Sequence, residues 1–464
     1  MNNAYIKLIE RKLSVVSPSG LSMFPDLPED LFPLQKVLTA WALRRGRCAI
    51  FADTGLGKTR MQIAWAHIIH AVTGVDVIIL APLAVAAQTV AEGAALGITV
   101  HLCRGAEDVR PGINITNYDR LHRFDSSRFG AVVLDESSCI KHHDSRTLQL
   151  LMDAFAYAPY KLCATATPAP NDWTELGTHA EFLGICKRVE MLSEFFSHYG
   201  GDTQTWRLKG HARRQFWRWV SSWGAMVRSP TDLGFDASAY ELPTLTVHEH
   251  TVESTQNAIG TLFAMEAQTL SERRLARRNS IESRVAACAA VVNGEPNESW
   301  VVWCDLNAEG DALTSAIHGA VQISGSDSID EKEQRLHSFA SGDTKIIVSK
   351  PSIAGYGCNW QHCSRMAFVG VTDSFESYYQ AVRRIWRFGQ KRPVQVHVFS
   401  SEAEGAVVAN LKRKERDALI MAESLSSETR DAVREEVTGS SRYTNDYKAI
   451  TAVTAPSWLQ SEIL

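Results

Sequence analysis

The chain has 464 residues, of which 45% are hydrophobic and 22% are charged, and its formal net charge is −4 at pH 7. This is the composition of an ordinary globular protein, and its length suffices for two to three domains at roughly 150 residues per domain. The slightly acidic balance excludes binding to nucleic acid through bulk positive charge, so any such binding requires local basic surfaces.

Residues 1–30 are predicted to be an N-terminal extension. Its first part, MNNAYIKLIERKLSVV, is interrupted by charged residues and has no long apolar run, so it does not resemble a secretory signal. The most apolar internal stretch, VIILAPLAVAAQTVA, is shorter than the roughly 20 residues that a transmembrane helix needs. The nine cysteines show no CxxC spacing, and their odd number favours reduced thiols. We therefore expect a cytoplasmic protein without membrane association.

Short runs rich in Val and Ile alternate with longer amphipathic segments in residues 31–235. Such runs predict parallel strands that are buried on both faces by covering helices. The predicted strands are CAIFAD (48–53), DVIILAP (76–82), INIT (113–116), AVVLDE (131–136) and KLCATATP (161–168). The sequence therefore predicts an α/β domain in this region.

The alternation stops near residue 184, and residues 185–235 are predicted to be a helical, basic and aromatic insertion in this first domain. Within it, the segment 206–230 contains six Lys and Arg residues, four Trp residues and no acidic residue. Basic side chains neutralise phosphates, and aromatic rings can stack on bases. For the Trp residues, base stacking and packing into the first domain are equally favoured. The arginines favoured as nucleic-acid contacts are Arg207, Arg213 and Arg214.

The strand pattern resumes after a linker at residues 236–250, which is expected to feed an edge strand. The later predicted strands are SWVVWC (299–304), AVQIS (320–324), TKIIVS (344–349), RMAFVGV (365–371) and VQVHVFS (394–400). We therefore predict a second α/β domain over residues 251–402, with a helix over 253–290. Within that helix, the basic stretch 271–284 is slightly better explained as a solvated face than as a nucleic-acid contact. Residues 403–464 are expected to form a charged helix and a tail.

Residues 52–59, ADTGLGKT, lie between a predicted strand and a helix-like segment, as the phosphate-binding P-loop does. Two glycines allow backbone amides to turn toward phosphate oxygens, while Lys58 reaches the outer phosphates and Thr59 offers its hydroxyl to Mg²⁺. Ala52 stands where the P-loop usually begins with glycine. The residues predicted to bind ATP here are Thr54, Gly55, Leu56, Gly57, Lys58 and Thr59.

Asp135 and Glu136 follow the buried run AVVL, downstream of this loop. Two carboxylates at a strand end suit two roles in nucleotide hydrolysis: Asp135 would hold Mg²⁺, and Glu136 would orient and activate the attacking water. The predicted cofactor is therefore Mg²⁺ bound together with ATP.

Six segments of the first half resemble the motifs of superfamily-two helicases, and in particular those of the Swi/Snf-type double-stranded-DNA translocases. These are LFPLQKVLTAWAL (31–43), ADTGLGKT (52–59), IILAPLAVAAQT (78–89), ITNYDRL (115–121), LDESS (134–138) and CATATPAPNDWTELG (163–177). The resemblance implies that Gln35 reads adenine and that Thr165 and Thr167 couple hydrolysis to movement. The acidic motif reads DESS here, whereas the family's reads DEAH.

The second half resembles motifs IV, V and VI of the same family in VVWCDLNAEGDAL (301–313), SIAGYGCNWQHC (352–363) and QAVRRIWRFGQKRPVQVHVF (380–399). The last segment is close to the family pattern Q-A-x-D-R-x-H-R-x-G-Q, with Arg383 and Trp386 in place of the Asp and His. The resemblance implies that Asn359 contacts nucleic acid. The residues that it implies for catalysis, beside Lys58 and Glu136, are Gln380, Arg384 and Arg387.

The resemblance covers roughly residues 30–420 and implies a P-loop α/β fold with two RecA-like parallel-sheet lobes. It implies an ATP-dependent translocase on DNA, most readily double-stranded DNA, in a compact form such as bacteria or phages carry. The expected location is accordingly the bacterial cytoplasm, or the host cytoplasm for a phage protein. Three alternatives remain open from the sequence: an RNA helicase of the same superfamily, a nucleotide-gated nucleic-acid-binding switch without motor activity, and a small-molecule P-loop kinase, which leaves motif VI unexplained.

Overall fold

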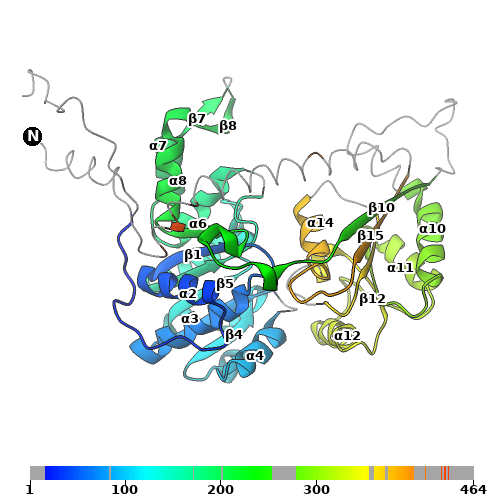
Figure 1. Ribbon diagram of the computed structural model, residues 1–464, viewed down its shortest axis with the longest axis horizontal. Helices are drawn as coiled ribbons and strands as arrows, with labels where there is room; N and C mark the ends of the chain where they lie inside the picture. Colours follow the sequence, from blue (N-terminus) through cyan, green and yellow to red (C-terminus); the bar gives the residue numbers. More distant parts are fainter. Residues whose placement is uncertain are drawn as a thin grey trace, which may run out of the picture.

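The computed structural model describes residues 16–82, 85–170, 172–199, 202–252, 278–354, 360–370, 375–401, 413, 430, 433–434 and 437. Two α/β lobes, each built around a parallel sheet, lie side by side (Figure 1). This arrangement confirms the predicted fold class of two RecA-like lobes. In the described part of the chain, we find no helix with both the length and the apolar character needed to cross a membrane.

The sheet of lobe 1 has seven strands in the order β3-β4-β2-β5-β6-β1-β9, and every neighbouring pair is parallel. Its strands are β1 (Arg47–Ala52), β2 (Asp76–Ala81), β3 (Val100–Leu102), β4 (Ile113–Asn117), β5 (Phe129–Asp135), β6 (Tyr160–Ala164) and β9 (Gly224–Val227). All five runs predicted in this lobe are strands. The short strands β3 and β9 lack a long apolar run, and they were not predicted.

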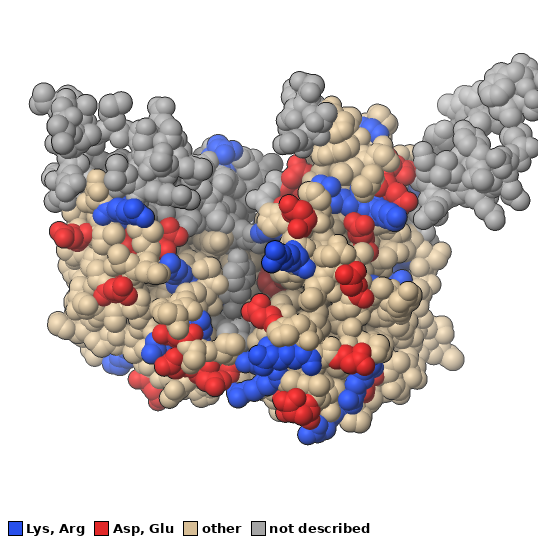
Figure 2. Space-filling model, turned by 180° about the vertical axis from the view of Figure 1, so that it is seen from behind, with Lys and Arg blue, Asp and Glu red and all other residues tan. Residues whose placement is uncertain are grey.

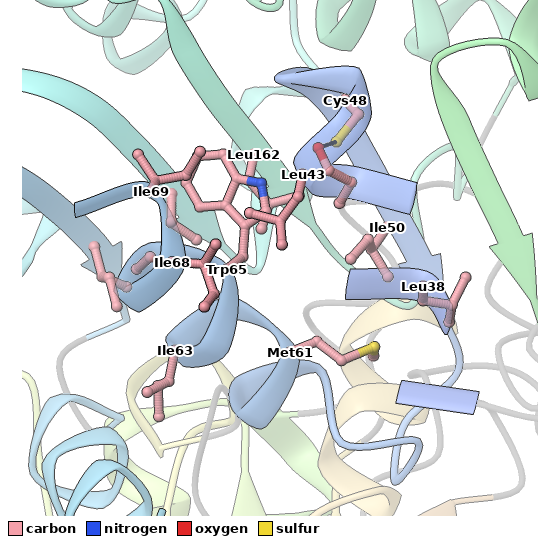
Figure 3. Packing of buried hydrophobic residues seen from close by; sticks show 14 of the residues in the cluster. Leu38, Leu43, Cys48, Ile50, Met61, Ile63, Trp65, Ile68, Ile69 and Leu162 are labelled. Carbon is pink, nitrogen blue, oxygen red and sulfur yellow. Dashed lines mark hydrogen bonds between the residues drawn. The ribbon is translucent and has the colours of Figure 1, made fainter. Parts of the chain in front are cut away.

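The helices of lobe 1 are α2 (Pro33–Arg45), α3 (Lys58–Thr73), α4 (Ala86–Ala95), α5 (Arg146–Ala154), α6 (Leu176–Phe182), α7 (Arg188–Phe195) and α8 (Arg213–Ser221). Alternate residues of each strand enter different apolar clusters, because successive side chains point to opposite faces of a sheet. In β1, Cys48 and Ile50 pack with Trp65 of α3, whereas Phe51 packs with Trp223. Figure 3 shows how α2 and α3 cover the first of these two faces.

The segment 185–235 differs from the predicted helical insertion. It contains α7 and α8, but between them an antiparallel hairpin of β7 (Phe196–Tyr199) and β8 (Asp202–Leu208), which lies at one end of the lobe (Figure 1). Its last part, β9, pairs with β1 and forms an edge of the main sheet. The segment is therefore integral to the lobe, because its final strand completes the sheet beside the P-loop strand.

The sheet of lobe 2 has six parallel strands in the order β10-β15-β14-β11-β13-β12. Its strands are β10 (Leu245–Val252), β11 (Trp300–Cys304), β12 (Ala320–Ile323), β13 (Ile346–Ser349), β14 (Arg365–Val369) and β15 (Val394–Ser401). Its helices are α10 (Ile281–Asn293), α11 (Asn307–Ala316), α12 (Ile329–Ser341), α13 (Pro351–Ala354) and α14 (Phe375–Val382). Since β10 is an edge strand, the predicted strand after the linker is confirmed, but lobe 2 begins at Leu245 and not at residue 251.

Both terminal regions contribute described residues to lobe 1. Backbone amides of Ser19 and Leu21 donate to carbonyls at the end of α2, and Leu21 joins the apolar cluster beneath that helix. Val433 and Val437 are buried in the same cluster. The predicted N-terminal extension therefore packs against lobe 1 from residue 16 onward. Part of the predicted tail, which follows lobe 2 in the sequence, also packs in lobe 1.

Candidate active site between the lobes

The loop between β1 and α3 has the conformation of an anion-binding turn. Gly55 and Gly57 have φ of 94° and 83°, in the left-handed region that side chains disfavour. A Cβ on Gly57 would also lie 2.1 Å from Nε2 of Gln35, and one on Gly55 would lie 3.0 Å from the backbone nitrogen of Phe388 in lobe 2. Gly57 is the N-cap of α3 and provides no side-chain cap, so the first amides of the helix remain available for an anion.

Lys58 is the first residue of α3, and its ammonium group folds back over the loop. Nζ donates to the carbonyl oxygens of Ala52, at 2.9 Å, and Asp53, at 3.3 Å. Burial lowers the pKa of Lys58, while the carboxylates of Glu136, Asp53 and Asp135 oppose this effect. The lysine thus lies beside the acid pair, at the start of α3.

The acid pair lies at the carboxyl end of β5, two strands from the P-loop strand. The carboxylate of Asp135 accepts a 2.7 Å hydrogen bond from Gln62 of α3, and burial raises its pKa, an effect that Gln62 partly offsets. Glu136 has a φ of 57° and is the only described non-glycine residue with positive φ. Such backbone strain in a residue with a side chain is typical of functional positions.

A chain of hydrogen bonds connects this acid pair to lobe 2. Thr165 Oγ1 donates to Glu136 Oε1 at 2.7 Å and accepts from the backbone amide of Thr167 at 3.1 Å. The Thr167 hydroxyl accepts from Nε2 of Gln380 at 3.3 Å, and Arg384 donates to Oε1 of Gln380 at 3.1 Å. Five predicted residues from both halves of the sequence are therefore connected from the carboxylate to the arginine.

The two serines that replace the usual residues of the acidic motif are both buried. Ser138 Oγ donates to Glu136 Oε1 at 3.4 Å, so it supports the same oxygen as Thr165. Ser137 Oγ lies 3.2 Å from Nε2 of His179 on α6, and the imidazole packs edge-on against Phe51 of β1. The DESS sequence thus connects the strand end to α6, which sequence comparison did not predict.

A cavity of about 440 Å³ lies between the lobes. Leu56 is not among its lining residues, because its side chain packs in the core of lobe 1 while its carbonyl accepts from Gln35 at 3.1 Å. Thr165 and Thr167 contact lining residues from behind. The predicted site residues that line the cavity are Gln35, Thr54, Gly55, Gly57, Lys58, Thr59, Asp135, Glu136, Gln380, Arg384 and Arg387.

Three aromatic side chains that were not predicted surround one end of this cavity. Phe32 precedes α2, Tyr240 belongs to the linker and Phe388 lies in the motif VI segment of lobe 2. Their ring centroids are 5.2 to 6.0 Å apart, and Gln35 lies beside them with its Oε1 accepting from the Phe32 amide. Flat apolar surfaces next to a side-chain amide suit a planar heterocycle. Phe32 and Phe388 are more than 350 positions apart in the chain, so no local sequence pattern could have predicted that these rings lie together.

The predicted nucleic-acid contacts are only partly described. Arg207 on β8 and Arg213 and Arg214 on α8 are exposed, and the guanidinium of Arg213 lies over the ring of Trp173 at 5.7 Å. Asn359 lies outside the described residues. On the face shown in Figure 2, basic and acidic side chains are interspersed over both lobes, so that face offers no uniformly positive surface.

Of the two interpretations of the Trp residues in the segment 206–230, packing is the one that the structure supports. Trp217 and Trp223 are at most 1% exposed within the core of lobe 1, and Trp206 and Trp219 are half-buried against it. For Trp217 the cause is an apolar face of α8, on which Phe216, Trp217 and Val220 are buried while the arginines of this helix are exposed.

The comparison with known proteins identifies one part of the chain. Residues 284–389 match the model of the helicase conserved C-terminal domain, which is a RecA-like domain. No curated protein shows significant similarity to the chain. The matched region runs from α10 through α14 to the arginines that line the cavity. Residues 284–389 of lobe 2 are thus similar to a helicase C-terminal domain, and this supports a place for the chain in the helicase superfamily.

Proposed function

We propose that the chain is an ATP-driven motor that translocates on double-stranded DNA. The match of lobe 2 supports a helicase-type, nucleic-acid-dependent ATPase in general. The observation that carries the proposal is the hydrogen-bonded chain from Glu136 to Arg384, across a cavity lined by both lobes. Because the catalytic groups come from both lobes, ATP hydrolysis depends on the relative position of the lobes and can in turn change that position.

In this proposal the loop 53–57 and the start of α3 bind the phosphates of ATP. The positive φ of two glycines turns amides toward the cavity, and the helix N-terminus adds a favourable dipole. Lys58 would exchange its bonds to the carbonyls of Ala52 and Asp53 for bonds to phosphate oxygens. The adenine would occupy the end of the cavity beside Gln35, where the rings of Phe32, Tyr240 and Phe388 offer stacking surfaces.

Thr59 and Asp135 fit the role of Mg²⁺ ligands, since both line the cavity. The raised pKa of Asp135 reflects a buried carboxylate, and a divalent cation beside it would stabilise the ionised form. Mg²⁺ would supply charge neutralisation for the phosphates.

Glu136 would orient the attacking water and accept its proton, with its carboxylate fixed by Thr165 and Ser138. Arg384 and Arg387 would stabilise charge that develops on the γ-phosphoryl group, and an arginine in this role is worth about 10³–10⁵ in rate. Their contact with ATP requires the two lobes to be close together. The cleft would therefore close with ATP and relax after hydrolysis.

Double-stranded DNA is proposed as the track because the motif III and motif VI segments resemble those of the DNA-translocating branch. The exposed arginines Arg207, Arg213 and Arg214 support a contact with phosphates on the hairpin side of lobe 1. Nucleic acid held there and by lobe 2 would be gripped and released in alternation as the cleft opens and closes.

The proposal is tested by measuring ATP hydrolysis with duplex DNA, single-stranded DNA and RNA, beside a triplex-displacement assay on duplex DNA. We expect stimulation by duplex DNA and displacement of the third strand. Stimulation by RNA alone would establish an RNA helicase in its place, and negligible turnover with every nucleic acid would establish a binding switch. The Lys58→Ala variant should lose turnover, and unchanged hydrolysis in this variant would refute the assigned site.

The nucleic-acid surface has its own test in Arg213→Ala and Arg214→Ala. Each should weaken duplex binding uniformly across sequences and reduce the slope of log affinity against log salt by about 1. As a matched control, Arg335→Gln removes an arginine of lobe 2 that pairs with Asp327 at 2.7 Å, and duplex binding should be unchanged. Unchanged binding in both lobe 1 variants would remove α8 from the proposed surface.

A further inference from the structure

A second set of contacts joins the lobes at the P-loop. Tyr379 of α14 donates from its hydroxyl to Asp53 Oδ1 at 2.8 Å, and Nη2 of Arg383 lies 3.3 Å from Asp53 Oδ2. Asp53 is the first residue after β1, and its Oδ1 also accepts from the amide of Thr54 at 2.6 Å. Both oxygens of this P-loop carboxylate are thus bound by side chains of lobe 2.

Arg383 is held in this orientation by two aromatic rings. Its guanidinium carbon lies 5.0 Å from the ring centroid of Tyr379 and 4.7 Å from that of Trp386. The indole of Trp386 donates to the carbonyl of Pro243 in the linker at 2.7 Å. Arg383 and Trp386 are the two residues that replace Asp and His in the motif VI pattern. An Asp at position 383 could not pair with Asp53, so this contact depends on the replacement.

The pKa shifts of Arg383 and Tyr379 favour the protonated side chains that bind Asp53. Burial lowers the pKa of Arg383, but Asp53 and Tyr379 outweigh this effect, and the pKa is raised. Burial and the neighbouring Asp53 raise the pKa of Tyr379, so its hydroxyl remains a donor at neutral pH. Side-chain exposure is 11% for Arg383 and 22% for Asp53, so water screens the pair only partly.

The two ends of this contact are connected to catalytic groups. The backbone carbonyl of Asp53 accepts from the ammonium group of Lys58, and the residue next to Tyr379 on α14 is Gln380, which bonds to Thr167. The position of α14 on the P-loop therefore determines where Gln380 and the following arginines lie relative to lobe 1.

We propose that Asp53, Tyr379 and Arg383 form a latch that positions α14 on the P-loop and keeps the two lobes close together. These are positioning residues, since their side chains act on the phosphate-binding loop and on α14. The inference rests on the proposed function for its kinetic consequences only. The latch itself is a geometric property of the chain and is measurable without ATP.

The geometric test uses single-molecule energy transfer between dyes on unnatural amino acids introduced at Tyr157 of lobe 1 and Asp343 of lobe 2, which are both exposed. Without nucleotide, Arg383→Gln and Asp53→Asn should both give a longer and broader distance distribution. Arg104→Gln is the matched control. This change removes a cation of lobe 1 that lies 3.4 Å from the carboxylate of Glu333 in lobe 2. The Arg104 side chain is 56% exposed, and exposed ion pairs contribute little to stability, so the distance distribution should not change. An unchanged distribution in both latch variants would refute the latch.

The kinetic test is a double-mutant cycle on ATP hydrolysis with Asp53→Asn and Arg383→Gln. Each single change should lower kcat/KM for ATP roughly 10- to 100-fold, because a hydrogen bond to a charged group is lost. The double variant should have a kcat/KM only slightly lower than that of either single variant. Arg383→Lys, which keeps the charge, should recover part of the loss. Additive losses would refute a shared function of the pair. Absence of turnover in the unaltered chain would refute the proposed motor, and the distance measurement would still decide whether the latch exists.

Discussion

At the scale of single residues, the carboxylate of Glu136 is oriented by its neighbours and by its own backbone. Two hydroxyls donate to one of its oxygens, and the residue itself adopts a left-handed conformation. A carboxylate held this way has a fixed direction toward the cavity, which is what a base that orients water requires. The hydroxyl of Thr165 is the shorter of the two contacts and lies outside the cavity lining.

We therefore expect Thr165→Val to lower kcat for ATP hydrolysis about tenfold, because a hydrogen bond to a charged group is lost from an isosteric side chain. KM should stay nearly constant, since Thr165 does not line the cavity. Steady-state kinetics of the two parameters tests this. Thr165→Ser, which retains the hydroxyl, is the control, and an equal loss in both variants would show that the methyl group is what matters.

His179 gives this region a dependence on pH. Burial lowers its pKa to about 4, well below the ordinary value near 6.5. Between these two values the unfolded chain binds a proton that the folded chain does not, so stability is lost as the pH falls from 6.5 toward 4. The pKa of His397 is also lowered to about 4, chiefly by burial, and it adds to the same trend.

The free energy of unfolding should thus fall between pH 6.5 and 4, with His179 contributing up to about 3 kcal/mol of that decrease. His179→Gln should flatten this part of the profile while keeping a polar partner for Ser137. Urea unfolding at a series of pH values measures the effect, and a variant profile parallel to the original would exclude His179 as its source.

At the scale of elements, helices α10 and α11 of lobe 2 are joined by a buried ion pair. Arg284 and Glu309 are fully buried with 2.8 Å between Nη2 and Oε1, and the other carboxylate oxygen accepts two amides at the start of α11. The sequence favoured a solvated face for the basic stretch that ends in Arg284. That interpretation is wrong for Arg284, because the facing carboxylate lies 25 positions away in the chain and only the folded lobe brings the two together.

Arg284→Met should lower the free energy of unfolding of lobe 2 by about 3–5 kcal/mol, because it leaves a buried carboxylate without its cation. The double variant Arg284→Met with Glu309→Gln should recover part of this loss. Arg392→Gln provides the comparison, since it removes an arginine that is 46% exposed in its pair with Glu298, and an exposed pair is worth about 1 kcal/mol at most. Denaturant unfolding compares them, and equal losses from the buried and exposed arginines would contradict the argument.

At the scale of the whole molecule, the end of the chain returns to the lobe that begins it. Val433 is fully buried in the core of lobe 1, and Arg430 lies 3.5 Å from Asp232 in the same lobe. Residues that follow lobe 2 in the sequence thus stabilise lobe 1, and this gives the chain a second connection between its halves besides the linker.

Val433→Asp should therefore destabilise lobe 1, by several kcal/mol, because it places an unpaired carboxylate in an apolar core. Arg430→Gln, at a site that is 51% exposed, should change stability little. Thermal unfolding measures both changes. If Val433→Asp leaves the unfolding temperature unchanged, the terminal region does not contribute to the core.

The sequence by itself determined the elements whose signal is local. Ten apolar runs became ten strands, and the P-loop glycines, Lys58 and the acid pair lie where strand ends and a helix start must place them, because these features depend on neighbours within about ten residues. Motif spacing in the second half likewise placed Gln380 and Arg384 on the cavity.

Only the tertiary structure decided how these parts meet. The edge position of β9, the burial of Trp217 and Trp223, the aromatic end of the cavity and the pairing of Asp53 with Arg383 all join residues far apart in the chain. A local pattern cannot specify such a partner, because any basic or aromatic residue fits it equally well until packing selects one. The two sets of residues that line the cavity could therefore be predicted from the two halves of the sequence, whereas contacts that join the lobes, such as that of Asp53 with Arg383, became visible only in the fold.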